Sequence, residues 1–360
     1  MKPTELMGIE SETGSIAGVA VMKLRVFIFA GIAFSLLSPV SLACAQSARL
    51  DVVKSRGTLR CGVNPNFAGF ALPDSAGEWR GFDVDMCRAV AAAVLGDSGK
   101  TQYVPLPAKD RFTALQSGDI DMLARNATWT LSRNTKLGVN FVATNFYDGQ
   151  AFMVKTAANI KSVNDLDGAS ICLISGTDTE RNLADFFSSR RMKFSTVAFE
   201  NADNVAEAYL GGRCDAFLND GTQLAAARLR TPDPKAHMVL PEAISMEPLS
   251  ISVLNGDDGW ADVVRWSFFA MVQAEELGLN SKNVREKTGG SNNPSVLRFA
   301  GKLEDLGAML AVDRDWAVRI VEQVGNYAEA YDRNIGPLGI ERGLNRLWKD
   351  AGLIVAPPMR

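Results

Sequence analysis

Three polar segments of the chain carry side chains that could do chemistry. They are the run from Arg125 to Arg133, the run from Ser175 to Glu180, and the pair Asn219-Asp220. Together they supply a planar guanidinium, hydroxyls and backbone donors at a helix start, and a carboxylate. A free amino acid needs this set, because its carboxylate matches arginine and a helix N-terminus and its ammonium matches an aspartate. Ser, Thr and Asp before helices are also ordinary caps, so residue types alone leave both interpretations open.

Motifs for other chemistry are weak. His237 is the single histidine and lies in a proline-rich stretch, so we expect a solvated loop residue rather than a metal ligand or triad member. Gly99-Lys100-Thr101 ends like a phosphate-binding loop, but Val94 stands where that motif needs glycine. No GxSxG sequence occurs, and no carboxylate pair is singled out as an acid/base couple. The sequence therefore predicts no cofactor, no metal and no enzymatic activity.

Each polar segment follows a predicted strand. Strands are predicted at 120–124, 170–174 and 215–219, and further strands at 58–63, 103–106 and 195–199. Helices alternate with them, predicted after Asp83 and Asp110 as caps and at 180–187 and 202–209. Alternation of this kind indicates mainly parallel sheets covered on both faces, with ligands bound beyond the carboxyl ends of the strands.

The order of elements predicts an α/β protein of two lobes. Residues 46–150 form part of the first lobe, 151–246 form the second, and 247–360 return to the first with a helical extension. Extended segments at 150–155 and 247–253 are the predicted crossings between the lobes. Helices are predicted in the tail at 261–277, 313–331 and 340–347.

The composition is that of an ordinary globular protein. The chain has 360 residues, 47% of them hydrophobic, which is enough for two cores. Its 38 basic and 41 acidic residues nearly cancel, which argues against a nucleic-acid partner. A monomer is the default expectation.

The N-terminal segment is typical of an export signal. Lys23 and Arg25 precede a short apolar run at 26–37, and Ala43-Cys44-Ala45 suits signal-peptidase cleavage after Ala45. Residues 1–21 fit no part of a signal, and translation from Met22 would account for them. Retention as a membrane anchor and acylation of Cys44 are the alternatives. Residues 1–45 are thus predicted to be removed, and the mature protein to lie in the periplasm.

Four cysteines remain after cleavage, in a compartment where disulfides persist. Four cysteines allow three pairings. Cys61 and Cys87 flank one β-to-α unit and Cys172 and Cys214 flank another, which favours one bridge in each lobe. Four buried free thiols are the alternative.

Several longer runs resemble one family. They are Gly81 to Asp85, Lys109 to Gly118, Arg125 to Arg133, Phe146 to Gln150, and Gly325 to Tyr327. With these runs, and across roughly Leu50 to Arg360, the chain resembles the periplasmic solute-binding proteins of polar amino-acid ABC transporters, most closely the general L-amino-acid-binding proteins. The resemblance implies the type II periplasmic-binding-protein fold, two lobes that close by a hinge motion over the ligand.

The resemblance also implies a role for individual residues. Arg133 would form a bidentate bond to the ligand carboxylate, helped by Asn126 and Thr128. Thr177 would bind the same carboxylate from the second lobe, and Asp220 would hold the ammonium. Phe67 would cover the ligand side chain.

Three positions depart from the family pattern. Asn64 replaces an aspartate of relatives selective for cationic amino acids, so a strictly cationic ligand is not expected. Arg125 replaces a small hydroxyl residue and would favour acidic or amide side chains. Asp178 replaces a threonine, and we expect it either to turn away or to pair with Arg125 on closure; a helix N-terminal acid stabilised by the dipole is the plain alternative.

The function that these observations predict is capture of free L-amino acids of broad range and their delivery to an inner-membrane ABC permease. An exported enzyme on the same fold, such as a dehydratase acting on an amino-acid precursor, is the competing hypothesis. The scarcity of acid/base groups argues against it. A sensor domain that signals through a partner is a third possibility.

Overall fold

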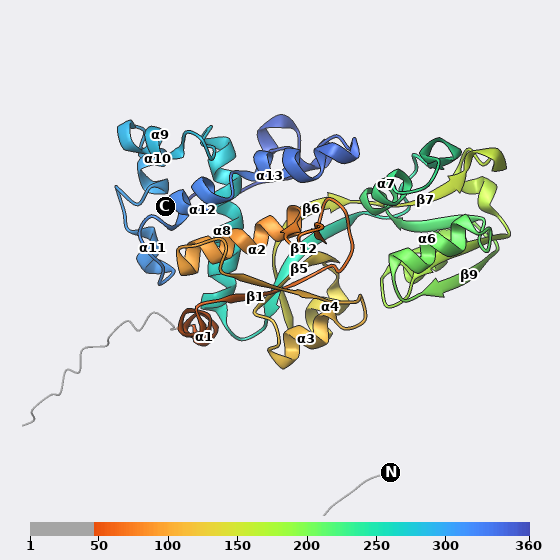
Figure 1. The fold of residues 1–360 in the computed structure, drawn as a ribbon, viewed down its shortest axis with the longest axis horizontal. Coiled ribbons are helices and arrows are strands. Elements are labelled where there is room, and N and C mark those ends of the chain that lie inside the picture. The colour runs from red at the N-terminus through yellow and green to blue at the C-terminus, as the bar shows by residue number, and fades with distance from the viewer. Residues whose placement is uncertain (1–46) are drawn as a thin grey trace, which may run out of the picture. The chain divides into compact units, whose positions relative to one another are not determined.

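The computed structural model describes residues 47–360, which form two lobes that are each built on a five-stranded sheet (Figure 1). The predicted signal peptide and its cleavage site lie outside the described residues. Within residues 47–360, no helix combines the length and the apolar character needed to cross a bilayer.

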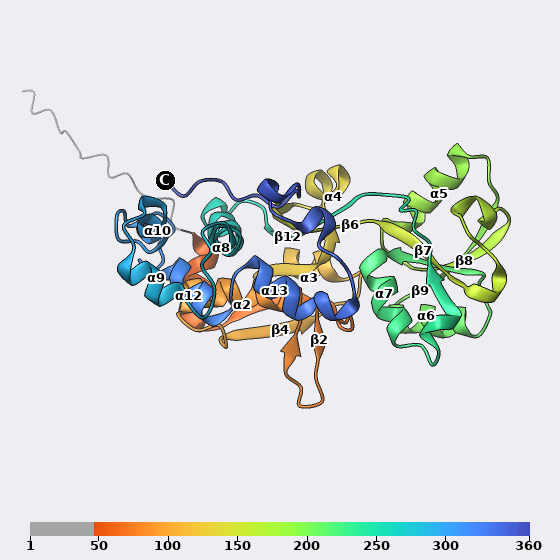
Figure 2. The same ribbon diagram turned by 90° about the horizontal axis from the view of Figure 1, so that it is seen from above.

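The first sheet has the order β4-β1-β5-β12-β6, and its first three strands are parallel while β12 runs antiparallel to both neighbours. Along β5, Met122 and Ala124 join the core cluster of one face, whereas Leu123 joins that of the other. This alternation buries both faces beneath helices. The elements of this lobe are β1 (Leu59–Val63), β4 (Thr101–Pro105), β5 (Met122–Thr128), β6 (Val139–Asp148), β12 (Glu247–Leu254), α1 (Ala48–Arg56), α2 (Phe82–Leu95), α3 (Arg111–Ser117), α4 (Leu131–Lys136), α8 (Asp258–Glu276) and the small hairpin β2 (Leu72–Pro73) and β3 (Trp79–Arg80), which projects from the lobe in Figure 2.

The second sheet has the order β11-β7-β10-β8-β9. Ala216 and Leu218 of its central strand pack with α5, and Phe217 between them packs with α6 and α7. Its elements are β7 (Gln150–Lys155), β8 (Ala169–Ile174), β9 (Phe194–Phe199), β10 (Ala216–Asp220), β11 (His237–Val239), α5 (Thr179–Ser189), α6 (Ala202–Leu210) and α7 (Gly221–Leu229).

The chain crosses between the lobes at two adjacent places. Strand β6 ends at Asp148 and β7 begins at Gln150, with Gly149 alone between them, and Asp148 pairs with Glu247 at the start of β12. A β-carbon on Gly149 would lie 2.9 Å from both the Ala243 β-carbon and the Ser245 carbonyl oxygen, so only glycine lets the two crossing segments approach this closely.

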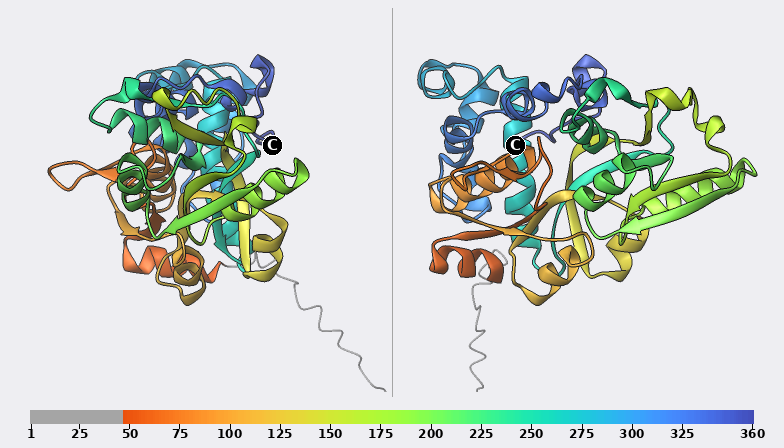
Figure 3. Two further views of the ribbon diagram at one scale, coloured as in Figure 1. Left: turned by 90° about the vertical axis from the view of Figure 1, so that its right-hand side faces the viewer. Right: turned by 45° about the vertical axis from the view of Figure 1, so that its right-hand side comes forward.

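The C-terminal helices pack on the first lobe. Helices α12 and α13 contact α2 and α8, and the blue tail lies beside the orange and teal helices in Figures 2 and 3. The tail consists of α9 (Val284–Gly290), α10 (Pro294–Phe299), α11 (Leu306–Met309), α12 (Trp316–Gln323) and α13 (Tyr327–Asn334).

Two sequence predictions for the tail are wrong in detail. The segment 313–331 is two helices, because Gly325 has a φ of 99° and ends the first. The predicted helix at 340–347 is only a single turn at Gly343–Asn345, since Gly343 has a φ of 48°, outside the right-handed helical region.

Both predicted disulfides form, one in each lobe. Cys61 of β1 is bonded to Cys87 of α2, and Cys172 of β8 is bonded to Cys214, which precedes β10. Each bridge ties a strand to a neighbouring segment of the same lobe.

The predicted cap of α2 is wrong. The helix begins after Gly81, and no side chain caps it. Asp83 is instead buried in the first turn, where its carboxylate accepts hydrogen bonds from the Asn126 backbone N–H and the Asn145 side chain.

Candidate functional site

The carboxyl ends of β1, β5, β8 and β10 meet around a cavity of about 30 Å³ between the two lobes. Parallel strands bring their following residues to one edge of a sheet, which explains why segments far apart in sequence converge here. The lining residues are Asn64, Ala108, Arg111, Arg125, Asn126, Thr128, Arg133, Gln150, Ile174, Thr177, Asp178, Thr179, Asn219, Asp220 and Gln223.

The structure brings together all but one of the predicted ligand-binding residues. Phe67 is the exception, because it lines a separate, neighbouring cavity and stacks on Phe70 with ring centroids 4.4 Å apart. Strand β5 also extends further than predicted, so that Arg125, Asn126 and Thr128 lie within the strand rather than beyond its end.

Arg133 is held at the start of α4 by local structure. Thr130 caps this helix, and one guanidinium nitrogen of Arg133 donates to the Thr128 carbonyl at 2.8 Å. The same nitrogen lies 2.7 Å from a carboxylate oxygen of Asp178, across the cleft. Burial lowers the pKa of Arg133, while the nearby Asp178 opposes that shift.

The expected pairing of Asp178 with Arg125 is wrong. Arg125 points elsewhere: its Nε donates to the Leu106 carbonyl at 2.8 Å. Burial lowers the pKa of Arg125 to about 10, and the charge of Asp83 works against the shift. Asp178 pairs with Arg133 instead.

Asp220 is the last residue of β10 and is buried in the cavity wall. Burial, with repulsion from Asp148 and Glu247, raises its pKa well above the ordinary value. The Asn126 side chain hydrogen-bonds this carboxyl, and Asn126 in turn accepts from the Asn64 side chain at 3.0 Å. A network of amides thus joins the first lobe to the candidate ammonium site.

Several groups at the crossings are committed to structural contacts. The Thr128 hydroxyl donates to Glu247, which also accepts from Asn182 and Ser245. The Thr177 hydroxyl donates to the Ile174 carbonyl at 2.8 Å, so this side chain currently closes the turn before α5.

Two buried donors in the cavity wall have no hydrogen-bond partner within residues 47–360: Nε of Arg111 and Nδ2 of Asn219. Buried polar groups rarely remain unpaired, so these two donors are available to an acceptor that enters the cavity. Burial, and repulsion by Arg125 and Arg133, lower the pKa of Arg111 well below the ordinary value.

Sequence reasoning assigned no role to Arg111 or Asn219. The position of Arg111 offered one signal, because it opens the helix that follows strand β4, and Arg133 lies in the first turn of the helix that follows β5. Three arginines, Arg111, Arg125 and Arg133, therefore line one small cavity together with Asp178 and Asp220.

His237 and the acidic groups also differ from expectation. His237 is buried in β11, where its Nδ1 lies 2.9 Å from the Tyr209 hydroxyl, so it is not a solvated loop residue. Asp148 and the buried Glu247 join Asp220 in an acidic group at the crossings, and no sequence pattern singled out these two residues. Within the described residues, no cluster of three or more His, Cys, Asp or Glu side chains is arranged to hold a metal ion.

Comparison with known proteins identifies the family that shares this fold. Residues 59–290 match the model of the bacterial extracellular solute-binding proteins, family 3. The chain belongs to this family. A solved ABC transporter / periplasmic binding protein from Brucella ovis with glutathione bound is 48% identical, with a TM-score of 0.85 over 88% of this chain and 100% of its own.

Two curated members of the family are similar over nearly their full length. The general L-amino acid-binding periplasmic protein AapJ of Rhizobium johnstonii is 48% identical over 89% of this chain and 95% of its own. The glutamate/glutamine/aspartate/asparagine-binding protein BztA of Rhodobacter capsulatus is 46% identical over 90% and 97%. The family and the two-lobed α/β fold expected from the sequence are confirmed.

Proposed function

We propose that the protein is the substrate-binding component of an ABC transporter, which captures free L-amino acids in the periplasm and delivers them to an inner-membrane permease. Its membership of family 3 supports the general role, and the names of AapJ and BztA support the ligand class.

One observation carries the proposal: Arg133 from the first lobe and Asp220 from the second line the same buried cavity. A zwitterion carries the two opposite charges that these side chains would neutralise. Because each charge comes from a different lobe, a single amino acid would bridge both and hold the cleft closed.

The charge balance of the cavity favours acidic and amide side chains within a broad range. Arg111 and Arg125 remain when Arg133 is assigned to the α-carboxylate, and the unpaired Asn219 amide adds a neutral donor. A second carboxylate or an amide oxygen would satisfy these donors, whereas a cationic side chain would meet repulsion.

Asp178 stands in the place of the ligand carboxylate. A cavity of about 30 Å³ has room for about two water molecules, which is too little for an amino acid. Binding therefore requires Asp178 to leave Arg133, and the ligand carboxylate takes over the contact. The N–H groups at the N-terminus of α5 lie beside the same position and would add to the binding of that carboxylate.

The competing enzyme hypothesis receives little support. An ancestral amino acid-binding protein, AncCDT-1, titled as a precursor of cyclohexadienyl dehydratase, is 29% identical, with a TM-score of 0.55 over 66% of this chain. That protein is itself described as a binding protein. We propose that purified protein leaves amino-acid precursors unchanged.

The test is thermal unfolding of refolded, ligand-stripped protein with each common L-amino acid, using Arg133→Ala and Asp220→Ala. A ligand at a hundredfold excess over its dissociation constant stabilises the folded state by about 2.7 kcal/mol. We expect upshifts with glutamate, glutamine and other amino acids that either substitution abolishes. The matched control is Arg181→Ala, an exposed arginine on α5. No upshift with any amino acid would overturn the proposal.

A further inference from the structure

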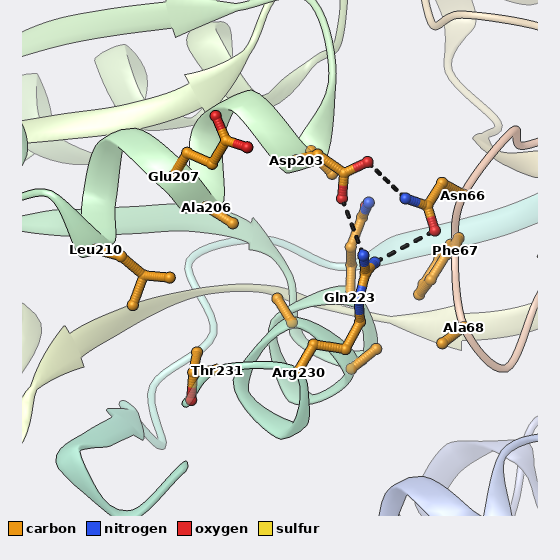
Figure 4. A pocket seen from close by; sticks show the side chains of 13 residues that line it. Asn66, Phe67, Ala68, Asp203, Ala206, Glu207, Leu210, Gln223, Arg230 and Thr231 are labelled. Carbon is orange, nitrogen blue, oxygen red and sulfur yellow. Dashed lines mark hydrogen bonds and ion pairs between the residues drawn. The ribbon is translucent and has the colours of Figure 1, made fainter. Parts of the chain in front are cut away.

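A second cavity, of about 360 Å³, adjoins the central one (Figure 4). The loop residues Asn66, Phe67 and Ala68 form its wall on the first lobe, and α6 and α7 form its wall on the second. Its volume lies in the range of about 300–1,000 Å³ that is usual for small-molecule sites. We call it the outer cavity.

The two cavities share Gln223 of α7, which lines both. One loop also serves both, because Asn64 lines the central cavity and Asn66 to Ala68 line the outer one. A ligand held by Arg133 and Asp220, with its side chain directed past Gln223, would enter the outer cavity beside Phe67. Phe67, which lines the outer cavity, would then cover the ligand side chain.

The chemistry of the outer cavity is part apolar and part polar. Four alanines of α6 and α7 line the outer cavity, and their small side chains leave room in it: Ala202, Ala206, Ala226 and Ala227. Gln223 offers a donor and an acceptor, as a peptide group requires. Such a surface suits a short extended backbone better than a compact side chain.

The lining of the outer cavity also includes a cation, Arg230. Arg230 donates to the Asn66 side chain at 3.2 Å and lies 3.3 Å from Asp203, and Asn66 also donates to Asp203 at 2.5 Å (Figure 4). Arg230 and Asp203 have half-exposed side chains, 55% and 49%, so their pairing is weak and exchangeable. A terminal carboxylate could replace Asp203 at Arg230, as the α-carboxylate would replace Asp178 at Arg133.

We propose that the outer cavity is a second subsite, which receives the extension of an amino acid whose side chain is joined by an amide bond to a further residue. γ-Glutamyl peptides are the ligand class with these features: an amino-acid head for Arg133 and Asp220, an amide near Gln223, and a terminal carboxylate for Arg230. This inference rests on the proposed function, because the head group must occupy the central cavity.

The experiment is calorimetric titration of ligand-stripped protein with L-glutamine and with γ-L-glutamylglycine. We expect both ligands to bind the unsubstituted protein. Ala206→Phe fills the outer cavity and weakens γ-L-glutamylglycine at least about tenfold, while glutamine changes less than about threefold. Asn204→Phe adds the same ring at an exposed position of α6 that does not line the outer cavity, and it leaves both affinities unchanged.

Arg230→Gln gives an independent readout if Ala206→Phe does not fold. Loss of one charge-assisted hydrogen bond lowers the affinity for γ-L-glutamylglycine relative to glutamine by about tenfold. Glutamine binding without γ-L-glutamylglycine binding, or equal loss of both ligands in each variant, would overturn the inference and leave the proposed function intact. Failure of every amino acid to bind would overturn the proposed function itself.

Discussion

In the cavity, the Arg133 guanidinium contacts two groups, the Thr128 carbonyl and the Asp178 carboxylate. Its side chain is only 9% exposed, so removing one partner leaves a buried charge unpaired, which costs more than losing one partner of a surface ion pair. Two consequences for binding follow, one for each member of the pair.

Replacing Arg133 by Gln is expected to weaken L-glutamate binding by at least about thirtyfold, because truncating one partner of a buried charge pair costs about 2–5 kcal/mol. Isothermal titration measures the loss. Arg181→Gln, on the exposed side of α5, removes the same charge and should change the affinity less than about twofold. Equal affinities for the Arg133 variant and the unsubstituted protein would exclude this residue as the carboxylate site.

Replacing Asp178 by Asn is expected to tighten binding, by about tenfold, because the ligand carboxylate no longer displaces a charged competitor from Arg133. The change is read from the same titration. Asp185→Asn alters the charge of the same helix at an exposed position and serves as the control. Weaker binding in the Asp178 variant would mean that this carboxylate contacts the ligand favourably.

Asp220 should make binding depend on pH. Burial, with repulsion from Asp148 and Glu247, raises the pKa of the empty site, and a bound ammonium would favour the ionised carboxylate. Binding then releases a proton wherever the empty site is still protonated. We therefore expect the dissociation constant for L-glutamate to rise as the pH falls, measured by titration at several pH values. An affinity that stays constant, or improves, in acid would contradict this assignment.

The residues of the site were largely predictable, but their partners were not. Arg133, Asp178 and Asp220 follow predicted strands, and the family resemblance gave each a role. Which guanidinium Asp178 meets depends on the direction of side chains across the cleft, and nothing local in the sequence sets that direction. Arg111 was overlooked because its burial and its lack of a partner are properties of the packed cavity.

At the scale of elements, strand β11 shows how pairing overrides local composition. His237 follows a proline-containing turn, yet it pairs with Lys155 of β7 and its ring packs against Tyr209 with centroids 5.4 Å apart. Burial, with the charge of Lys155, lowers the pKa of the imidazole below its ordinary value of 6.5.

This histidine should make the folding stability depend on pH. Because its pKa is lower in the folded protein, the unfolded chain binds the proton first as the pH falls below about 6.5. The free energy of unfolding then decreases until the folded pKa is reached. In His237→Gln this contribution is absent, so the stability difference between the two proteins should shrink from about pH 7 to about pH 5. Denaturant titrations at both pH values measure it, and parallel curves would contradict it.

Element boundaries were predictable where glycine or strand burial marks them. Gly118 ends α3 in a left-handed conformation, which glycine adopts readily. The end of β5 was missed because Arg125 and Asn126 are polar, and polar residues at the carboxyl end of a buried strand resemble a loop in sequence. The backbone of Asn126, at a φ of 35°, is held there by the buried Asp83 carboxylate, a contact that no spacing rule anticipates.

At the scale of the whole molecule, closure brings few strong contacts outside the cavity. Lys109 and Glu200 join the two lobes at 3.0 Å, but their side chains are 58% and 73% exposed. Such pairs contribute about 0–1 kcal/mol. The closed state therefore depends on the buried charges in the cleft, which is where the ligand acts.

Lys109→Gln should accordingly change the affinity for L-glutamate by less than about fivefold. Lys193→Gln, an exposed lysine of the second lobe, is the matched control, and both are measured by titration at low and high salt. A loss comparable to that of the Arg133 variant would show that surface contacts, rather than the cavity, hold the lobes together.

The C-terminal extension has a further effect through strand β6, the outermost strand of the first sheet. Asn345 hydrogen-bonds both the N–H and the carbonyl of Tyr147, and the Tyr327 hydroxyl donates to the Asn145 carbonyl. An uncovered edge strand is a template for pairing with another chain. The tail thus occupies backbone groups of this edge strand, and we expect it to limit edge-to-edge pairing between copies of the protein.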